Sequence, residues 1–180
     1  MKKRTVLGLG LGLVGLGAVA TSLVAGVKYA KMKKAIRTGQ VDGWIKEVTG
    51  SLVPYEIKSD IPTPAYIEDD RSKIYFRLSD EDLIQLALTK QSFKTTVQAV
   101  AAHEMGHAID HDLEDIQEIV HQAIRERDYD TYKEMVLERE RRAWRLGRQF
   151  APDQAFFDKF NKNNLRAYAL RITVEKGAWK

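Results

Sequence analysis

Hydrophobic residues follow three different patterns along the chain, and each pattern predicts a different kind of element. Residues 5–27 carry no charge, and as a helix these 23 residues would span roughly 34 Å, enough to cross a bilayer core. Between residues 55 and 78, aromatic and β-branched residues alternate with charged ones, which is typical of strands with one solvent-facing side. From about residue 92 onward, apolar residues recur every three or four positions and predict helices.

These patterns predict a short sheet followed by several helices. Residues 38–54 read as a linker that leads into a short helix. We expect strands at 55–57, 65–67 and 73–78, the last two forming a hairpin across the polar turn 68–72. Predicted helices run from an N-cap at Ser79 to Leu88, from about 92 to 121 with a break shortly after the histidines, and from about 130 to a stop at Pro152; one or two short helices follow over 153–180.

The N-terminal apolar run is predicted to be a membrane anchor within residues 1–37. Lys2, Lys3 and Arg4 precede it, and five basic residues follow it at 28–37. A cleaved signal peptide is the alternative, because Ala18-Val19-Ala20 resembles a cleavage site. The apolar run continues to Val27, which favours an uncleaved single-pass membrane protein of bacterial or phage type. The orientation stays open, since the charges on the two flanks argue for opposite sides.

Glycines within this run have two interpretations. Gly10, Gly12 and Gly15 match a dinucleotide-binding GxGxxG pattern, but no strand precedes it and the first acidic residue is Asp42. Small residues in a membrane helix explain the pattern better. Gly8 and Gly12 form one GxxxG pair, which indicates self-association through the Gly-rich helix.

Charge is distributed unevenly, and this changes what the net charge of +4 implies. Residues 1–37 hold eight of the 29 basic residues and no acidic residue, so residues 38–180 carry a net charge of −4. The basic residues are therefore expected to meet membrane lipid, and nucleic acid is not expected as a partner. The chain has no cysteine, which excludes disulfides and thiolate metal sites.

The chemistry of the chain is concentrated in residues 103–107, HEMGH, on a predicted helix. Residues four apart lie on one helical face, about 40° from each other, so His103 and His107 can reach a single zinc ion. Glu104 then points beside the metal towards a bound water. Zinc lowers the pKa of that water, and Glu104 is expected to accept its proton as general base. Gly106 weakens the helix, which indicates that another group lies close to it.

A catalytic zinc site needs a third protein ligand and an open position. A continuing helix would place His111 about 12 Å along the axis from His103, so both could bind one ion only if the helix broke. The HExxHxxGxxH pattern of metzincins is absent, because Asp110 and Leu113 stand at its glycine and third-histidine positions. His111 and His121 are therefore interpreted as surface histidines.

Glu140 is the predicted third ligand. On a helical wheel, Val136, Ala143 and Gly147 lie within about 60° of it, so this carboxylate is expected to be buried. A buried carboxylate needs a metal ion or another cation. The alternative to a metal ligand is an ion pair with Lys133 or with an arginine of another element.

His103-Glu104-Met105-Gly106-His107, followed 33 residues later by Glu140-Arg141-Arg142-Ala143-Trp144, resembles the gluzincin class of zinc metallopeptidases. The chain is also similar to small bacterial and phage zincin domains of the ImmA/IrrE-like kind. The resemblance covers about residues 55–150. It implies an α+β fold over residues 38–180, in which a small antiparallel sheet or hairpin packs on the HExxH helix and on a second ligand-bearing helix, all preceded by one transmembrane helix.

The resemblance also implies further parts of an active site. An edge strand beside the active helix would pair with extended substrate, and Lys73–Leu78 is the natural candidate. A His, Tyr or Arg often stabilises the oxyanion, and Tyr168 and Arg166 are available for this. Many gluzincins have Asp or Asn where Trp144 stands here, so Asp110 is a candidate to orient a histidine instead, with a capping or surface role as the alternative.

The leading hypothesis is a membrane-anchored zinc endopeptidase that hydrolyses protein or peptide substrates. Zn2+ would be bound by His103, His107 and Glu140, with Glu104 as general base. The alternative is a non-catalytic zincin-fold module that docks a protein partner at the membrane. A plain membrane scaffold would leave the buried Glu140 unexplained.

Overall fold

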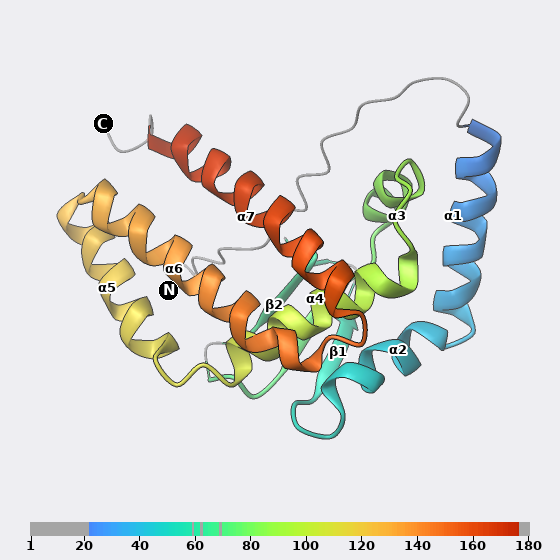
Figure 1. Cartoon of the computed structure of the whole chain (residues 1–180), viewed down its shortest axis with the longest axis horizontal. Helices are drawn as coiled ribbons and strands as arrows, with labels where there is room; N and C mark the ends of the chain where they lie inside the picture. The colour runs from blue at the N-terminus through green and yellow to red at the C-terminus, as the bar shows by residue number, and fades with distance from the viewer. Residues whose placement is uncertain (1–21, 59, 62, 69, 177–180) are drawn as a thin grey trace.

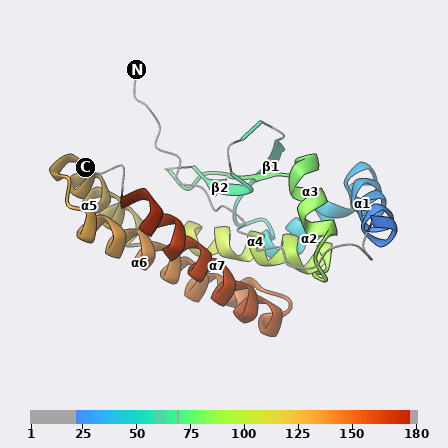
Figure 2. The same cartoon turned by 90° about the horizontal axis from the view of Figure 1, so that it is seen from above.

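Helix α4 (Phe93–Ala108) runs through the middle of the protein and packs against elements on both sides. The structure, a computed structural model, describes residues 22–58, 60–61, 63–68 and 70–176. Helix α2 (Gln40–Thr49) and the sheet lie against one part of α4, and helices α6 (Tyr129–Gly147) and α7 (Gln154–Glu175) contact another (Figure 1). In the view from above, α1 and α3 lie at the opposite end of the molecule from α5, α6 and α7 (Figure 2).

The sheet has three strands in the order β1-β3-β2. Strand β2 (Ala65–Ile67) pairs antiparallel with β3 (Ile74–Arg77), which confirms the hairpin, whereas β1 (Tyr55–Lys58) pairs parallel with β3. The predicted α+β fold class with an antiparallel sheet is therefore wrong: most of the described residues are helical, and the sheet is small and mixed. Alternating polarity places strands but does not set their order or direction.

Most of the helices lie where the sequence predicts them. The Ser79 hydroxyl accepts a hydrogen bond from the Asp82 N–H at 3.2 Å and begins α3 (Asp80–Ala87). The expected break after the histidines separates α4 from α5 (Leu113–Glu126). Helix α6 is followed by a short 3₁₀ turn (Arg148–Phe150) before Pro152. The C-terminal region differs from expectation, because it forms one helix of 22 residues, α7.

Helix α1 (Ser22–Arg37) overlaps the end of the predicted anchor, and it packs onto the rest of the protein. Its Lys28 ammonium donates to the carbonyls of Leu86, Thr89 and Gln91 at 2.8, 2.9 and 2.6 Å, and Met32 and Ala35 enter the main core. The basic residues after position 27 thus belong to a helix that docks on α2 and α3.

Among the residues that the structure describes, every helix is too short or too polar to cross a membrane. The fold prediction of one transmembrane helix, and the single-pass membrane location that depended on it, are therefore wrong for this part of the chain. The overlapping helix α1 begins only at Ser22. Residues 5–21 of the predicted span, with the glycine pair proposed for self-association, lie outside the described residues.

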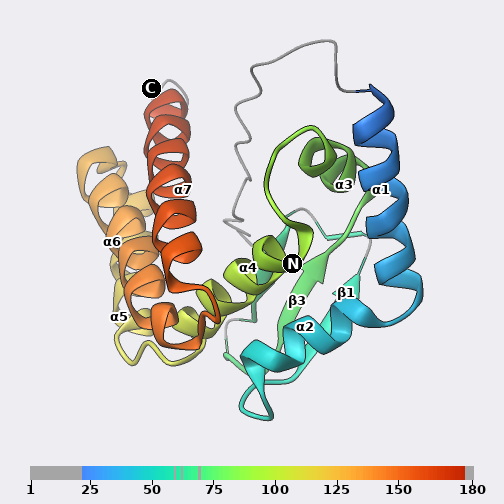
Figure 3. The same cartoon turned by 45° about the vertical axis from the view of Figure 1, so that its right-hand side comes forward.

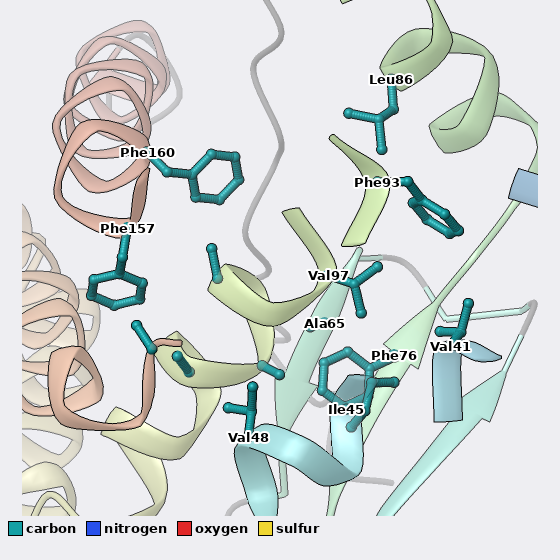
Figure 4. Close-up of a cluster of buried hydrophobic side chains, with 14 of the residues drawn as sticks. Val41, Ile45, Val48, Ala65, Phe76, Leu86, Phe93, Val97, Phe157 and Phe160 are labelled. Carbon is teal, nitrogen blue, oxygen red and sulfur yellow. The ribbon is translucent and has the colours of Figure 1, made fainter. Parts of the chain in front are cut away.

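Two hydrophobic clusters hold these elements together. The larger one joins α1, α2, the sheet, α3, α4 and the start of α7, and Figure 4 shows its side chains converging from separate elements. They include Ile45, Val48, Phe76, Val97, Phe157 and Phe160. The smaller cluster lies between α5, α6 and α7 and includes Val120, Val136 and Ile172. The larger cluster thus packs against α4 and the smaller one against α6, and together they hold the two helices in position where they cross.

Candidate metal centre

Helices α4 and α6 cross at a contact between small residues. A Cβ atom added to Gly106 would overlap the carbonyl of Ala143 and lie 2.8 Å from the backbone nitrogen of Gly147. A Cβ atom added to Gly147 would overlap the carbonyl of Ala102. The two backbones touch directly where α4 and α6 meet, as the sequence indicated for Gly106, and Figure 3 shows the two helices side by side there. This contact brings Glu140 of α6 close to His103 and His107 of α4.

The crossing brings together the three predicted metal ligands. One ligand atom from each of His103, His107 and Glu140 lies within 4.8 Å of the others. The Nε2 atom of His103 is 3.3 Å from Oε2 of Glu140, and Nε2 of His107 is 3.8 Å from Oε1 of the same carboxylate. Two imidazole nitrogens and one carboxylate oxygen at this spacing can bind a metal ion.

Burial and missing hydrogen bonds fit a metal ion at this place. The side chains of His103 and Glu140 are 0% and 2% exposed. Both ring nitrogens of His103 and Oε2 of Glu140 are buried without a hydrogen-bond partner among the described residues. Unpaired buried polar atoms are costly, and the two that face each other, Nε2 of His103 and Oε2 of Glu140, are explained if both coordinate an ion. The donor set of two imidazoles and one carboxylate suits Zn2+, and it also suits other first-row divalent ions.

Glu104, the residue beside the first histidine, is buried close enough to Glu140 and Arg139 for their charges to act on it. It is 2% exposed, and its Oε1 atom is buried without a hydrogen-bond partner in the described protein. Burial, and then the charge of Glu140, raise the pKa of the Glu104 carboxyl to about 8, while the charge of Arg139 opposes the shift. Without a metal ion, Glu104 therefore holds a proton at neutral pH, and a nearby cation would favour its ionised form.

The protonation states of the ligands also suit metal binding. Burial and the neighbouring His103 lower the pKa of His107 to about 3, so its imidazole is neutral and can ligate. Burial opposes ionisation of Glu140, but the contact with His103 and the charge of Arg139 outweigh it and hold the pKa of this carboxyl below its usual range. The site therefore offers a neutral His107 imidazole and an ionised Glu140 carboxylate at neutral pH.

Arg139 is a residue of the site that sequence reasoning missed. Its side chain is buried, and its guanidinium donates to Oε1 of Glu140 from Nη2 at 3.0 Å and from Nε at 3.3 Å. Glu140 thus has a cationic partner, but this partner is the preceding residue of α6, whereas the alternative interpretation named Lys133 or an arginine of another element. The wheel gave no sign of this, because an arginine at the border of an apolar face is ordinarily solvated.

Trp144 supports a histidine through its ring. The indole lies against the imidazole of His103 with ring centroids 4.2 Å apart, and it packs on Phe157 and Phe160 of α7 behind it. At this position, where the gluzincin pattern has Asp or Asn, this chain has an aromatic ring that packs against His103. Nδ1 of His103 accordingly has no hydrogen-bond partner in the described protein.

Other candidates lie away from the ligands. The Asp110 carboxylate accepts hydrogen bonds from Arg142 at 2.7 and 2.9 Å and from the backbone of Asp112, so it does not orient a histidine. His111 and His121 are exposed, as expected, and so is Arg166. Tyr168 is buried beside Arg139; burial and the charge of Glu140 raise the pKa of its hydroxyl, so it stays protonated and can donate.

Lys73–Leu78, which was expected to be an edge strand, lies in the middle of the sheet. Strand β3, within Lys73–Leu78, is the central strand, so its backbone is occupied on both sides. The edge strand that contacts α4 is β2. The signal that could have shown this is burial, because Ile74, Tyr75 and Phe76 are consecutive large residues that are all buried.

Comparisons of the chain with protein-family models, with curated proteins and with solved structures found no match. The gluzincin resemblance therefore rests on the two sequence motifs. The geometry described above establishes a cluster of two histidines and a glutamate that can bind a metal ion.

Proposed function

We propose that the protein is a zinc-dependent peptidase in which His103, His107 and Glu140 bind the ion and Glu104 is the general base. The observation that supports this proposal is the environment of Glu104, a second buried carboxylate that follows His103 on α4, has an unpaired oxygen and is close enough to Glu140 for that charge to raise its pKa. A purely structural zinc site has no need of a second carboxylate there.

The ion and the side chains around it would have different roles in peptide hydrolysis. The bound ion would supply Lewis acidity and lower the pKa of a water molecule at the site. Glu104 would accept a proton from that water and pass it to the leaving amine. Trp144 restrains the ring of His103 through its close contact. Tyr168, buried beside Arg139, provides a hydroxyl that can donate to developing negative charge if substrate reaches it.

Strand β2 is the place where an extended peptide would bind. It is an edge strand and contacts α4, the helix that carries His103, Glu104 and His107. Backbone pairing with an edge strand orients a peptide without requiring a particular sequence. A protein or peptide substrate is therefore proposed, with β2 taking the role that the sequence assigned to Lys73–Leu78.

The proposal is tested by hydrolysis of a peptide library, read by mass spectrometry, with zinc-loaded wild type and zinc-loaded Glu104→Gln. Wild type is expected to cut peptides, and Glu104→Gln is expected to keep its zinc and lose cleavage by about 100-fold or more. Glu118→Gln, at an exposed position on α5, is the matched control and should cut like wild type. Cleavage that survives Glu104→Gln would contradict the assignment of the general base.

A structural metal site is a second candidate, and the burial of the centre favours it. His103, Glu104, His107 and Glu140 are all less than 9% exposed, whereas a catalytic ion must be reached by substrate. In this case the protein would be a binding module in which zinc ties α4 to α6. Stoichiometric zinc together with complete absence of peptide cleavage would select this candidate.

A further inference from the structure

The two oxygens of the Glu140 carboxylate have different surroundings. Oε1 accepts two hydrogen bonds from the guanidinium of Arg139, at 3.0 and 3.3 Å. Oε2 has no hydrogen-bond partner in the described protein and lies 3.3 Å from Nε2 of His103. Oε1 is therefore already hydrogen-bonded to Arg139, and Oε2 is available to coordinate a metal ion.

We infer that Arg139 is a positioning residue that restricts Glu140 to coordination through one oxygen, Oε2. The inference rests on the metal site of the proposed function and goes beyond it, because it concerns how many ligand atoms the protein provides. A carboxylate can bind a metal through one or both oxygens. The fork of the guanidinium occupies the lone pairs of Oε1 that a second metal bond would need.

Burial makes this restriction effective. Arg139 is 9% exposed, so water does not compete for its hydrogen bonds, and Tyr168 of α7 lies against the same guanidinium. Two histidines and one carboxylate oxygen give three protein ligands, which leaves a tetrahedral ion one position for water or substrate. With both oxygens bound, the protein would fill that position itself. Arg139 is therefore expected to determine whether the ion keeps a free coordination position for water or substrate.

The first test reads the coordination number by the visible absorption of Co2+, which is strong in four-coordinate sites and weak in sites of higher coordination. Wild type is expected to give the strong spectrum. Arg139→Gln removes the fork and is expected to lose much of the intensity, and Arg139→Lys, which returns a charge and one donor, should recover part of it. Arg141→Gln, at an exposed neighbour on α6, is the control and should match wild type. Equal spectra for wild type and Arg139→Gln would overturn the inference.

A second test needs no variant and holds even if Arg139→Gln fails to fold. X-ray absorption and a crystal structure of zinc-loaded wild type should show one carboxylate oxygen on the ion and Arg139 still hydrogen-bonded to the other. Two carboxylate oxygens on zinc, or Arg139 turned away from Glu140, would overturn the inference and leave the proposed peptidase standing. A wild-type protein that binds neither Co2+ nor Zn2+ would overturn both.

Discussion

Gly106 of α4 and Gly147 of α6 face each other where the two helices cross, and a Cβ atom on Gly106 would lie 2.8 Å from the backbone nitrogen of Gly147. No side chain separates the backbones at this point. The same crossing places Glu140 within 4.8 Å of the ligand atoms of both histidines. The glycine within HEMGH thus matters for the metal centre through the approach of a second helix.

Alanine at either glycine should force α4 and α6 apart. Gly106→Ala and Gly147→Ala are each expected to lower the free energy of unfolding by about 1–3 kcal/mol or more, because the obstructing atoms are backbone and cannot rotate away. Both should also weaken zinc binding, since Glu140 moves away from His103. Urea unfolding and zinc titration measure the two effects.

Gly43 in α2 provides the matched control for these substitutions. A Cβ atom there meets nothing within 4 Å, so Gly43→Ala should raise stability by roughly 0.5–1 kcal/mol through helix propensity alone. If Gly106→Ala behaved like Gly43→Ala, the close helix crossing would be wrong.

The ion pair between Asp110 and Arg142 is expected to stabilise the turn after α4. The Asp110 side chain is fully buried, and the guanidinium donates two hydrogen bonds to it at 2.7 and 2.9 Å. Asp110→Asn should cost about 1–3 kcal/mol, and a double-mutant cycle with Arg142→Gln should give a coupling of similar size. Zinc affinity should change little. A large loss of zinc affinity in Asp110→Asn without loss of stability would instead indicate that Asp110 orients a histidine.

Trp144 should report metal binding by its fluorescence. Its ring centroid is 4.2 Å from that of His103, so a paramagnetic ion such as Co2+ bound at the site should quench the indole strongly. Trp144→Phe should lose this quenching, whereas Trp44→Phe, which changes a tryptophan that packs on Phe93, should keep it. Quenching that persisted in Trp144→Phe would place the ion elsewhere.

The metal-free protein should lose stability as the pH rises from about 6.5 to 8. The pKa of Glu104 is raised from 4.5 to about 8 in the folded protein, so over this range the folded chain holds a proton that the unfolded chain has released. Folding then becomes less favourable by about 1.4 kcal/mol for each pH unit. Denaturant unfolding at several pH values, with a chelator present, measures this slope.

Glu104→Gln should remove that slope, because glutamine does not titrate. His107 contributes with the opposite sign at lower pH: its pKa is lowered from 6.5 to about 3, so the unfolded chain takes up a proton first and stability falls as the pH drops below 6.5. Above pH 6.5, the change of stability with pH therefore reports Glu104 without a contribution from His107. An unchanged slope in Glu104→Gln would show that another group causes it.

The cluster of His103, His107 and Glu140 was predictable from the sequence because helix geometry defines it. The spacing of His103 and His107 places both on one face, and the apolar residues around Glu140 identified a buried carboxylate on another helix. The helix does break after Ala108, but His111 is exposed in the turn that follows and is not part of the cluster of His103, His107 and Glu140.

The remaining features depend on tertiary structure. The position of β3 between β1 and β2 depends on long-range pairing of the strands, and no local pattern encodes this. The burial of Arg139 depends on its partner Glu140 and on α7, which lies far away in the sequence. The uncharged run 5–27 was interpreted from its composition, yet the part after Ser22 begins a helix that docks on α3.

The zinc content of the purified chain, measured by native mass spectrometry, tests the central claim most directly. Wild type and Glu138→Gln, which changes a partly exposed glutamate of α6, are expected to bind one zinc ion per chain. His103→Ala and Glu140→Gln are expected to bind none at the same zinc concentration. A wild-type chain without zinc, or a Glu140→Gln chain that retains it as firmly as Glu138→Gln, would contradict the account.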